Sequence, residues 1–196
     1  IMNWFAPVDI PIGLHWHHFG QNILPPIIPQ LKEQIPNEDF ALVYLPWEDP
    51  KLIESVLNKI SDKIFYVYGH TSKKKLRGNI KWKPFSRSGF IKDLESCNGV
   101  ICNAGFELTS ECLSLNKKIL VKPVMSQVEQ LANVKALDSL ELASTTNKIT
   151  SAVVSDWIEN DSKSLLPYFN VVDPVVDWIG SGNFDDIYSL RKKVWS

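Results

Sequence analysis

The sequence predicts an α/β fold built on a doubly wound, Rossmann-like parallel sheet of about six strands. From residue 38 onward, short apolar runs alternate with segments whose apolar residues recur at helical spacing. Strands buried on both faces, with helices between them, are typical of parallel sheets with right-handed crossovers. The composition, 44% hydrophobic and 22% charged, excludes the disordered and fibrous classes.

Each expected strand is a short apolar run that ends at a proline, a glycine or a polar turn. The expected strands span residues 40–45, 64–68, 79–83, 99–102, 119–121 and 140–142.

The expected helices fill the intervals between these strands. Asp49 is an N-cap followed by a proline at the first helical position, and Ser88 can cap a later helix. A further helix is expected over residues 126–137 and another around 149–157, and Asn116 suits a left-handed position after a helix end.

The two ends of the chain depart from this pattern. Six of the twelve prolines fall within residues 1–36, which excludes a regular helix or a central strand there. We expect an extended, packed segment with residues 24–29 as a stiff connector. At the other end, residues 173–174 begin a helix, residues 180–182 break it, and a final segment spans 184–195.

Charge and hydropathy limit the partners. With 21 basic against 22 acidic residues, the chain lacks the positive charge that a nucleic-acid backbone requires, and the basic cluster at residues 73–77 is interpreted as a solvated loop. No run of about 18 apolar residues could span a membrane, and no signal peptide is evident. Cys97, Cys102 and Cys112 are interpreted as reduced core thiols, which favours the cytoplasm.

The richest candidate site is the loop and helix start at residues 103–111, because ligands of such folds bind beyond the carboxyl ends of strands. Gly105 allows close backbone approach, and the free N–H groups of a helix start suit a pyrophosphate. Glu111, one turn after Glu107, could accept hydrogen bonds from two ribose hydroxyls. An ordinary strand-to-helix turn with glutamates near the positive dipole end explains the same residues.

A second constellation lies at residues 123–133. Ser126 and Glu129 match the capping-box pattern, which explains Glu129 without any ligand. That pattern does not explain Gln130, and an acid beside an amide at a helix start can hold sugar hydroxyls.

Together these two motifs resemble the C-terminal, donor-binding half of GT-B fold nucleotide-sugar glycosyltransferases. The resemblance includes the GlcNAc transferase of lipid-linked peptidoglycan synthesis and the UDP-glycosyltransferases of small molecules. In those families a small-Gly-aromatic turn precedes a glutamate, and a proline-ended strand leads to an acid-Gln-x-x-Asn motif. The matching residues in this chain are Asn103, Gly105, Phe106, Glu111, Pro123, Glu129, Gln130 and Asn133.

The resemblance implies a role for each matched residue. Glu111 would bind the ribose, the backbone around Gly105 and Phe106 the phosphates, and Glu129 with Gln130 the transferred sugar. The expected nucleotide-sugar-binding residues are Phe85, Ser86, Asn103, Ala104, Gly105, Phe106, Glu107, Glu111, Ser126, Glu129 and Gln130.

The resemblance also favours a UDP-sugar as the donor substrate, with no cofactor. The base would lie beside Pro84 and Phe85, with Ser86 and Phe90 nearby. The acceptor stays open among lipid-linked, saccharide and small-molecule compounds.

The phosphate contacts match the family pattern least well. The loop at residues 46–49 lacks the glycine-rich turn that many relatives place beside the pyrophosphate. Glu107 replaces an amide of the small-molecule enzymes, and Leu108 replaces a hydroxyl. Backbone amides, or His70 at the end of the second strand, are the alternative phosphate contacts.

By this resemblance the chain has three parts. Residues 1–37 are a proline-rich interdomain segment with a remnant of an N-terminal domain, residues 38–160 the nucleotide-sugar-binding domain, and residues 161–196 a helical extension that packs back toward the N-terminal domain. The catalytic base of GT-B enzymes usually lies in the N-terminal domain, so no catalytic residue is assigned and we expect a fragment that is inactive alone. The full-length protein would be cytoplasmic, or peripheral at the inner membrane face.

Three histidines, His15, His17 and His18, have several interpretations: a metal site, a polar cluster lining an interdomain cleft, or a packed aromatic segment. A metal site needs a third ligand and supporting contacts, and GT-B enzymes need no bound metal, so no metal is expected.

Two other functions compete with glycosyl transfer. An isomerase of the UDP-GlcNAc 2-epimerase type would use the same architecture, and a non-catalytic module could bind a nucleotide sugar. An NAD-dependent dehydrogenase is disfavoured because no Gly-x-Gly-x-x-Gly follows the first strand.

Overall fold

The computed structural model describes residues 7–28, 38–69, 71, 74–160 and 165–196. The chain divides into two compact units, each described here by itself: unit 1 combines residues 1–30 with 167–196, and unit 2 spans residues 31–166. His70 and residue 73 of the basic cluster lie outside the described residues.

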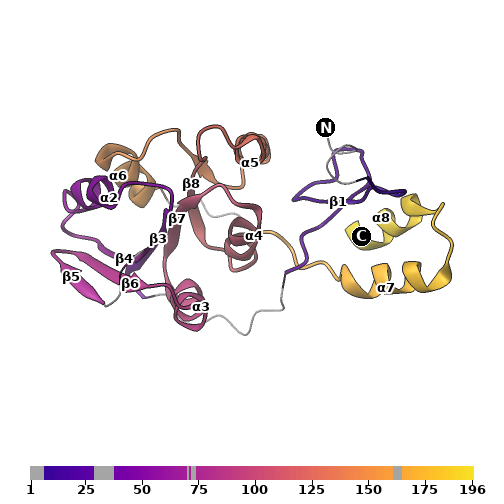
Figure 1. The fold of residues 1–196 in the computed structure, drawn as a ribbon, viewed down its shortest axis with the longest axis horizontal. Coiled ribbons are helices and arrows are strands. Elements are labelled where there is room, and N and C mark those ends of the chain that lie inside the picture. The colour runs from indigo at the N-terminus through magenta and orange to yellow at the C-terminus, as the bar shows by residue number, and fades with distance from the viewer. Residues whose placement is uncertain (1–6, 29–37, 70, 72–73, 161–164) are drawn as a thin grey trace. The chain divides into compact units, whose positions relative to one another are not determined.

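Unit 2 is a seven-stranded sheet with the strand order β5-β6-β4-β3-β7-β8-β9 (Figure 1). Every neighbouring pair is parallel except β5 with β6, so the predicted doubly wound α/β sheet is confirmed, with six parallel strands and one antiparallel edge strand. The strands are β3 (Phe40–Tyr44), β4 (Ile64–Gly69), β5 (Lys75–Arg77), β6 (Ile80–Pro84), β7 (Gly99–Asn103), β8 (Lys118–Lys122) and β9 (Ser144–Thr145).

Helices cover both faces of this sheet: α2 and α6 lie on one face, and α3 and α4 on the other (Figure 1). The alternation of side chains along each strand supplies both cores, and apolar residues of α2 and α6 pack with Val43, Ile101 and Leu120 on the first face. The helices of unit 2 are α2 (Pro50–Leu57), α3 (Arg87–Ser96), α4 (Phe106–Ser114), α5 (Val128–Ser139) and α6 (Ser151–Glu159).

Several predicted helix ends are confirmed. Asp49 caps α2, its carboxylate accepting a hydrogen bond from Lys51 N at 2.9 Å, and Asn116 is left-handed with φ of 52°.

The three cysteines are free and buried.

Three predicted ends in unit 2 are wrong. Ser86 caps α3 instead of Ser88, because the Ser86 hydroxyl accepts the hydrogen bond from Gly89 N. Helix α5 begins at Val128 and not at 126. Residues 140–142 form no strand: Glu141 has φ of 54° and closes the end of α5, and the last strand lies at Ser144–Thr145.

Part of the basic cluster is a strand and not a loop. Residues Lys75–Arg77 form β5, which pairs with β6 in the register Lys75↔Trp82. All three residues are exposed, and a short, charged strand is the usual composition at a sheet edge.

Unit 1 joins the two ends of the chain. Its elements are β1 (Gly13–Leu14), β2 (Ile23–Leu24), α7 (Val172–Ser181) and α8 (Ile187–Trp195). Leu24, Leu190 and Val194 share a small core, and the Trp195 indole donates a hydrogen bond to Ile23 O at 2.8 Å. Strands β1 and β2 are a two-residue parallel pair, consistent with an extended segment.

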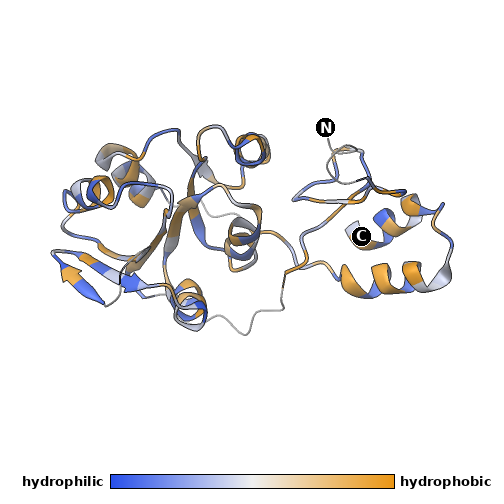
Figure 2. Ribbon diagram, in the orientation of Figure 1, coloured by the Kyte–Doolittle hydropathy of each residue, from blue (hydrophilic) through white to orange (hydrophobic). Residues whose placement is uncertain are grey.

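Helix α7 differs from its predicted limits. It begins at Val172, one residue before the predicted start, and continues through Gly180 to Ser181. Gly182, with φ of 67°, ends it. Figure 2 shows that apolar residues recur along α7, and Val176 and Ile179 remain more than half exposed. No helix in the described part of the chain combines the length and apolar character needed to cross a membrane.

Gly99, at the start of β7, is a position where the fold itself requires glycine. A Cβ atom there would lie 2.9 Å from both Lys118 O and a Trp157 ring carbon. We expect Gly99→Ala to lower the free energy of unfolding by about 1–3 kcal/mol, measured by urea denaturation.

The matched control is Gly180→Ala in α7, where an added Cβ meets nothing within 4 Å. Alanine is the better helix former, so this variant should be at least as stable as the parent chain. A Gly99→Ala variant of unchanged stability would contradict the packing of α6 against β7.

Candidate functional site

The candidate site lies at the carboxyl edge of the sheet, where β7 ends between β3 and β8. The loop after β7 is anchored to β8: the Asn103 side-chain amide and the Ala104 N–H both donate to Lys122 O, at 3.1 and 3.2 Å. From β3 the chain proceeds to β4 and β6 on one side and then returns to β7 on the other side of β3, and ligands of doubly wound sheets bind at such switch points.

A buried hydrogen bond connects the two predicted motifs. Asn133 on α5, 4% exposed, donates from its side-chain amide to Ala104 O at 2.9 Å. This bond fixes α5 against the loop that precedes α4. The structure therefore places the middle of α5, at Asn133, next to the loop at residues 103–105.

Gln130 orders the loop between β8 and α5. Its Oε1 accepts a hydrogen bond from Val124 N at 2.9 Å, and its Nε2 donates to Gln127 Oε1 at 2.8 Å. Gln130 is 9% exposed, whereas Glu129, in the first turn of α5, is exposed. The acid thus faces solvent, and the amide has structural partners.

The predicted capping box does not form. Gln127 is the N-cap of α5 and makes no side-chain capping bond, and Ser126 is exposed with φ of 75°. The N-cap lies one residue later than the pattern requires, so Ser126 and Glu129 do not occupy the reciprocal positions of the box.

Gly105 is the N-cap of α4 and leaves the start of this helix open. Its φ and ψ of −73° and 139° are accessible to any residue, and an added Cβ would meet nothing within 4 Å. The fold therefore does not require glycine here. Gly105 also supplies no side-chain acceptor to the first N–H groups of α4, which remain suited to an anion.

Glu111 lies half-buried on α4. Burial raises the pKa of its carboxyl above the ordinary value of 4.5; Glu107 raises it further, and the positive charge of Arg87 opposes the rise. Arg87, the first residue of α3, is a charged neighbour that the sequence analysis missed. Only the packing of α3 beside α4 on the same face of the sheet reveals it.

An aromatic wall lines the neighbouring part of the edge. Tyr44 at the end of β3 makes edge-to-face contacts with Phe85 and Phe90, with ring centroids 6.0 and 5.4 Å apart. Phe85 is 48% exposed, so its ring offers a stacking surface. Tyr44 was not predicted as a site residue; its position at a strand end was the available signal.

A buried polar network fixes α3 beneath this wall. Asp93 on α3 accepts hydrogen bonds from the Tyr68 hydroxyl at 2.7 Å and from Lys83 Nζ at 2.5 Å. Burial, followed by the hydrogen bond to Asp93, raises the pKa of Tyr68. Tyr68 therefore stays protonated and acts as a donor.

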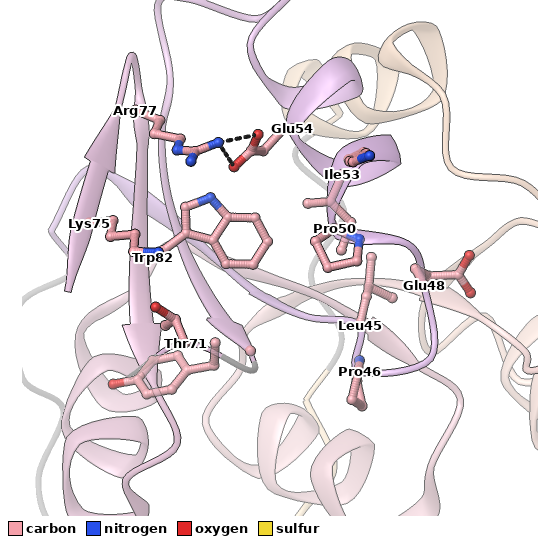
Figure 3. Close-up of a pocket in the computed structure, with 13 residues that line it drawn as sticks. Leu45, Pro46, Glu48, Pro50, Ile53, Glu54, Thr71, Lys75, Arg77 and Trp82 are labelled. Carbon is pink, nitrogen blue, oxygen red and sulfur yellow. Dashed lines mark hydrogen bonds and ion pairs between the residues drawn. The ribbon is translucent and has the colours of Figure 1, made fainter. Parts of the chain in front are cut away.

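A cavity of about 240 Å³ lies elsewhere on the same edge, beside α2 and the β5–β6 hairpin (Figure 3). Trp82 and Pro50 face one another across it, and Arg77 donates two hydrogen bonds to Glu54 at 3.0 and 3.1 Å (Figure 3). None of the predicted donor-binding residues lines this cavity. Tyr68 and Glu48 are among the residues that line it, so the cavity borders the candidate site.

The remaining predicted residues lie outside the described part of unit 2. His70 lies outside the described residues. His15, His17 and His18 belong to unit 1, and the Nδ1 atom of each accepts a backbone N–H from one or two residues further along the chain. Across the described residues, no group of three or more His, Cys, Asp or Glu side chains is placed to hold a metal ion.

Comparisons with known proteins agree with this architecture. The sequence pattern of glycosyl transferase family 1 matches residues 20–161. No curated protein matches the chain. A similar solved structure is the glycotransferase of kitacinnamycin, with a TM-score of 0.53, 15% identity, and 87% of this chain aligned with 44% of that one.

Two further structures were found. They are the glycosyltransferase SnogD from Streptomyces nogalater (TM-score 0.47, 15% identity, 97% of this chain and 47% of that one) and the spinosyn forosaminyltransferase SpnP (TM-score 0.46, 13% identity, 87% and 43%). This chain therefore spans less than half the length of each of these proteins.

Asn133→Ala tests the connection between the two motifs. Its loss leaves the buried Ala104 carbonyl without that donor, and we expect the free energy of unfolding to fall by about 1–3 kcal/mol in urea denaturation. Hydrogen exchange of the amides at residues 104–106 should accelerate.

The matched control is Asn98→Ala, whose exposed amide bonds to Asp39 at 3.1 Å. Its cost should stay below about 0.5 kcal/mol. Equal costs for the two variants would show that the Asn133 bond does not hold the loop.

Proposed function

We propose that this chain, which belongs to glycosyl transferase family 1, binds the nucleotide-sugar donor of a GT-B glycosyltransferase, and that the donor is a UDP-sugar. Family membership supplies the class of reaction, the transfer of a sugar. The candidate site supports the more specific assignment of donor binding to the carboxyl edge of this sheet.

The observation that carries the proposal is an open backbone and a half-buried carboxylate on the same helix. Gly105 begins α4 with no side chain in the way of a ligand, and Glu111 lies six residues later. At 1.5 Å per residue the two positions are about 9 Å apart along the helix, comparable with the extent of a nucleoside diphosphate from phosphate to ribose. Phosphates at the helix start and ribose hydroxyls on Glu111 therefore fit one ligand.

The other residues take the roles that the neighbouring geometry supports. Phe85 would stack on the base, with Ser86 nearby at the cap of α3. Glu129 would accept hydrogen bonds from the sugar hydroxyls, because it is exposed at the start of α5. Gln130 would add its remaining hydrogen-bonding capacity, since each of its two amide atoms has one partner already.

The chemistry of transfer needs charge stabilisation of the departing diphosphate and a base for the acceptor. The N-terminus of α4 can stabilise the developing charge, because its backbone N–H groups and helix dipole are fixed before the reaction. We assign the base to a part of the enzyme outside this chain. The isolated chain would then bind the donor without transferring sugar, and the acceptor stays unassigned.

Glu111→Gln tests the ribose contact. Hydrogen bonds to an ionised carboxylate are stronger than those to a neutral amide, so we expect the affinity for UDP to fall about tenfold or more in calorimetric titration. Uridine should lose affinity by the same factor, because the contact is to the ribose. Equal affinity of the parent and variant chains for both ligands would contradict the role of Glu111.

The raised pKa of Glu111 gives this variant a second signature. Only the ionised carboxylate accepts both hydroxyl hydrogen bonds, so the parent chain should lose affinity for uridine, which carries no titrating phosphate, as the pH falls toward the raised pKa, at a pH above 4.5. The Gln variant should not show this loss. Because a raised pKa makes the ionised form destabilising at neutral pH, Glu111→Gln should also raise Tm, by less than about 4 °C.

Gly105→Ala separates ligand binding from folding. An added methyl group meets no protein atom within 4 Å, so Tm should change by less than about 2 °C. If phosphates approach the backbone there, UDP affinity should fall about tenfold, and uridine affinity should change much less. Unchanged UDP affinity would exclude close approach of the phosphates at this residue.

A further inference from the structure

One buried ion pair at the carboxyl edge has no role in the donor contacts described above. Glu48, in the loop after β3, pairs with Lys122, the last residue of β8, with 2.5 Å between Oε1 and Nζ. Their side chains are only 13% and 11% exposed. Burial of an ion pair costs desolvation energy that its own attraction only partly offsets, so such a pair is weak evidence for a stabilising role alone.

The pair lies where the strand order places the end of β7. Strand β7 is the neighbour of both β3 and β8, so a side-chain contact from the loop after β3 to β8 must pass over β7. Asn103 at the end of β7 is the registered partner of Lys122, and registered partners in parallel strands direct their side chains to the same face. Glu48, Asn103 and Lys122 therefore form one group at the switch point of the sheet.

The side chain of Asn103 makes only part of its possible hydrogen bonds. Its Nδ2 donates to Lys122 O, but its Oδ1 is buried and has no hydrogen-bond partner among the described residues. Asn103 is 7% exposed, and a buried acceptor without a donor is costly. A ligand that carries both anionic oxygens and hydroxyl groups would satisfy the lysine and the amide oxygen together.

The charges of Glu48 and Lys122 would allow a diphosphate to replace Glu48 as the partner of Lys122. Glu48 neutralises Lys122, so the ammonium is not buried without a counter-charge. A diphosphate carries more negative charge than one carboxylate and offers several oxygens, so it competes for the three N–H donors of the lysine. The loop at residues 46–49 has no glycine-rich turn to supply backbone contacts in its place.

We propose that Lys122 is the cation that binds the diphosphate of the donor, and that Glu48 holds Lys122 in place until the donor arrives. This inference rests on the proposed function and adds to it a residue that discriminates nucleoside diphosphates from nucleosides. Lys122 contacts the ligand directly, whereas Glu48 acts as a positioning residue.

The test is a calorimetric titration of the 196-residue chain with UDP, uridine and inorganic pyrophosphate. Lys122→Met should weaken UDP and pyrophosphate about tenfold and leave uridine unchanged. Lys122→Arg, which keeps the charge, should retain most of the UDP affinity. Glu48→Gln removes the competing carboxylate and should tighten UDP about fivefold, again without effect on uridine.

The matched control is Glu54→Gln in the Arg77–Glu54 pair, which changes the net charge equally but lies beside α2. It should alter UDP affinity by less than about twofold. Circular dichroism and Tm of each variant establish that it folds. If Lys122→Met does not fold, Glu48→Gln still tests the proposal. Glutamine has the shape of glutamate, so this variant is expected to fold.

Two results would overturn the inference while the proposed function stands: Lys122→Met leaves the affinity for UDP unchanged, or Glu48→Gln weakens UDP binding as much as Lys122→Met does. The second result would mean that the pair serves only to hold the two loops together. If the parent chain binds none of the three probes, the proposed function itself fails, and the inference fails with it.

Discussion

The candidate site depends on β7 lying between β3 and β8, with the carboxyl ends of all three strands at one edge. That order brings three loops together that are far apart in sequence. Backbone and side-chain bonds then fix the loop after β7 to Lys122 O on one side and to Asn133 on α5 on the other. The helix start at Gly105 keeps its position because both neighbours hold the loop before it.

Three polar features that are unfavourable for stability lie at the same edge of the sheet. The carboxyl of Glu111 has a pKa raised by burial, the Asn103 amide oxygen lacks a donor, and Glu48 with Lys122 form a buried ion pair. Each of these groups is suboptimal for stability alone. A ligand with hydroxyl and phosphate groups would compensate all of them, which is the physical reason for placing the donor here and not in the cavity beside α2.

The sheet and its helices could be predicted because apolar runs and helical spacing are local signals. Strand β5 could not, because a three-residue edge strand with a single, exposed apolar residue carries no apolar period, and β9 is only two residues long. The motif at residues 103–111 was visible in the sequence, but Arg87 beside Glu111 and the Glu48–Lys122 pair were not. Those contacts join residues 24 and 74 positions apart, and only the topology of the sheet creates them.

The most direct test of donor binding at this edge is a titration of the ¹⁵N-labelled chain with UDP, followed by amide chemical shifts. The account requires saturable shifts at residues 104–111 and around Phe85, where phosphates, ribose and base are assigned. Absence of shifts there at millimolar UDP would contradict it. Shifts confined to the cavity lined by Trp82 and Arg77 would contradict it equally.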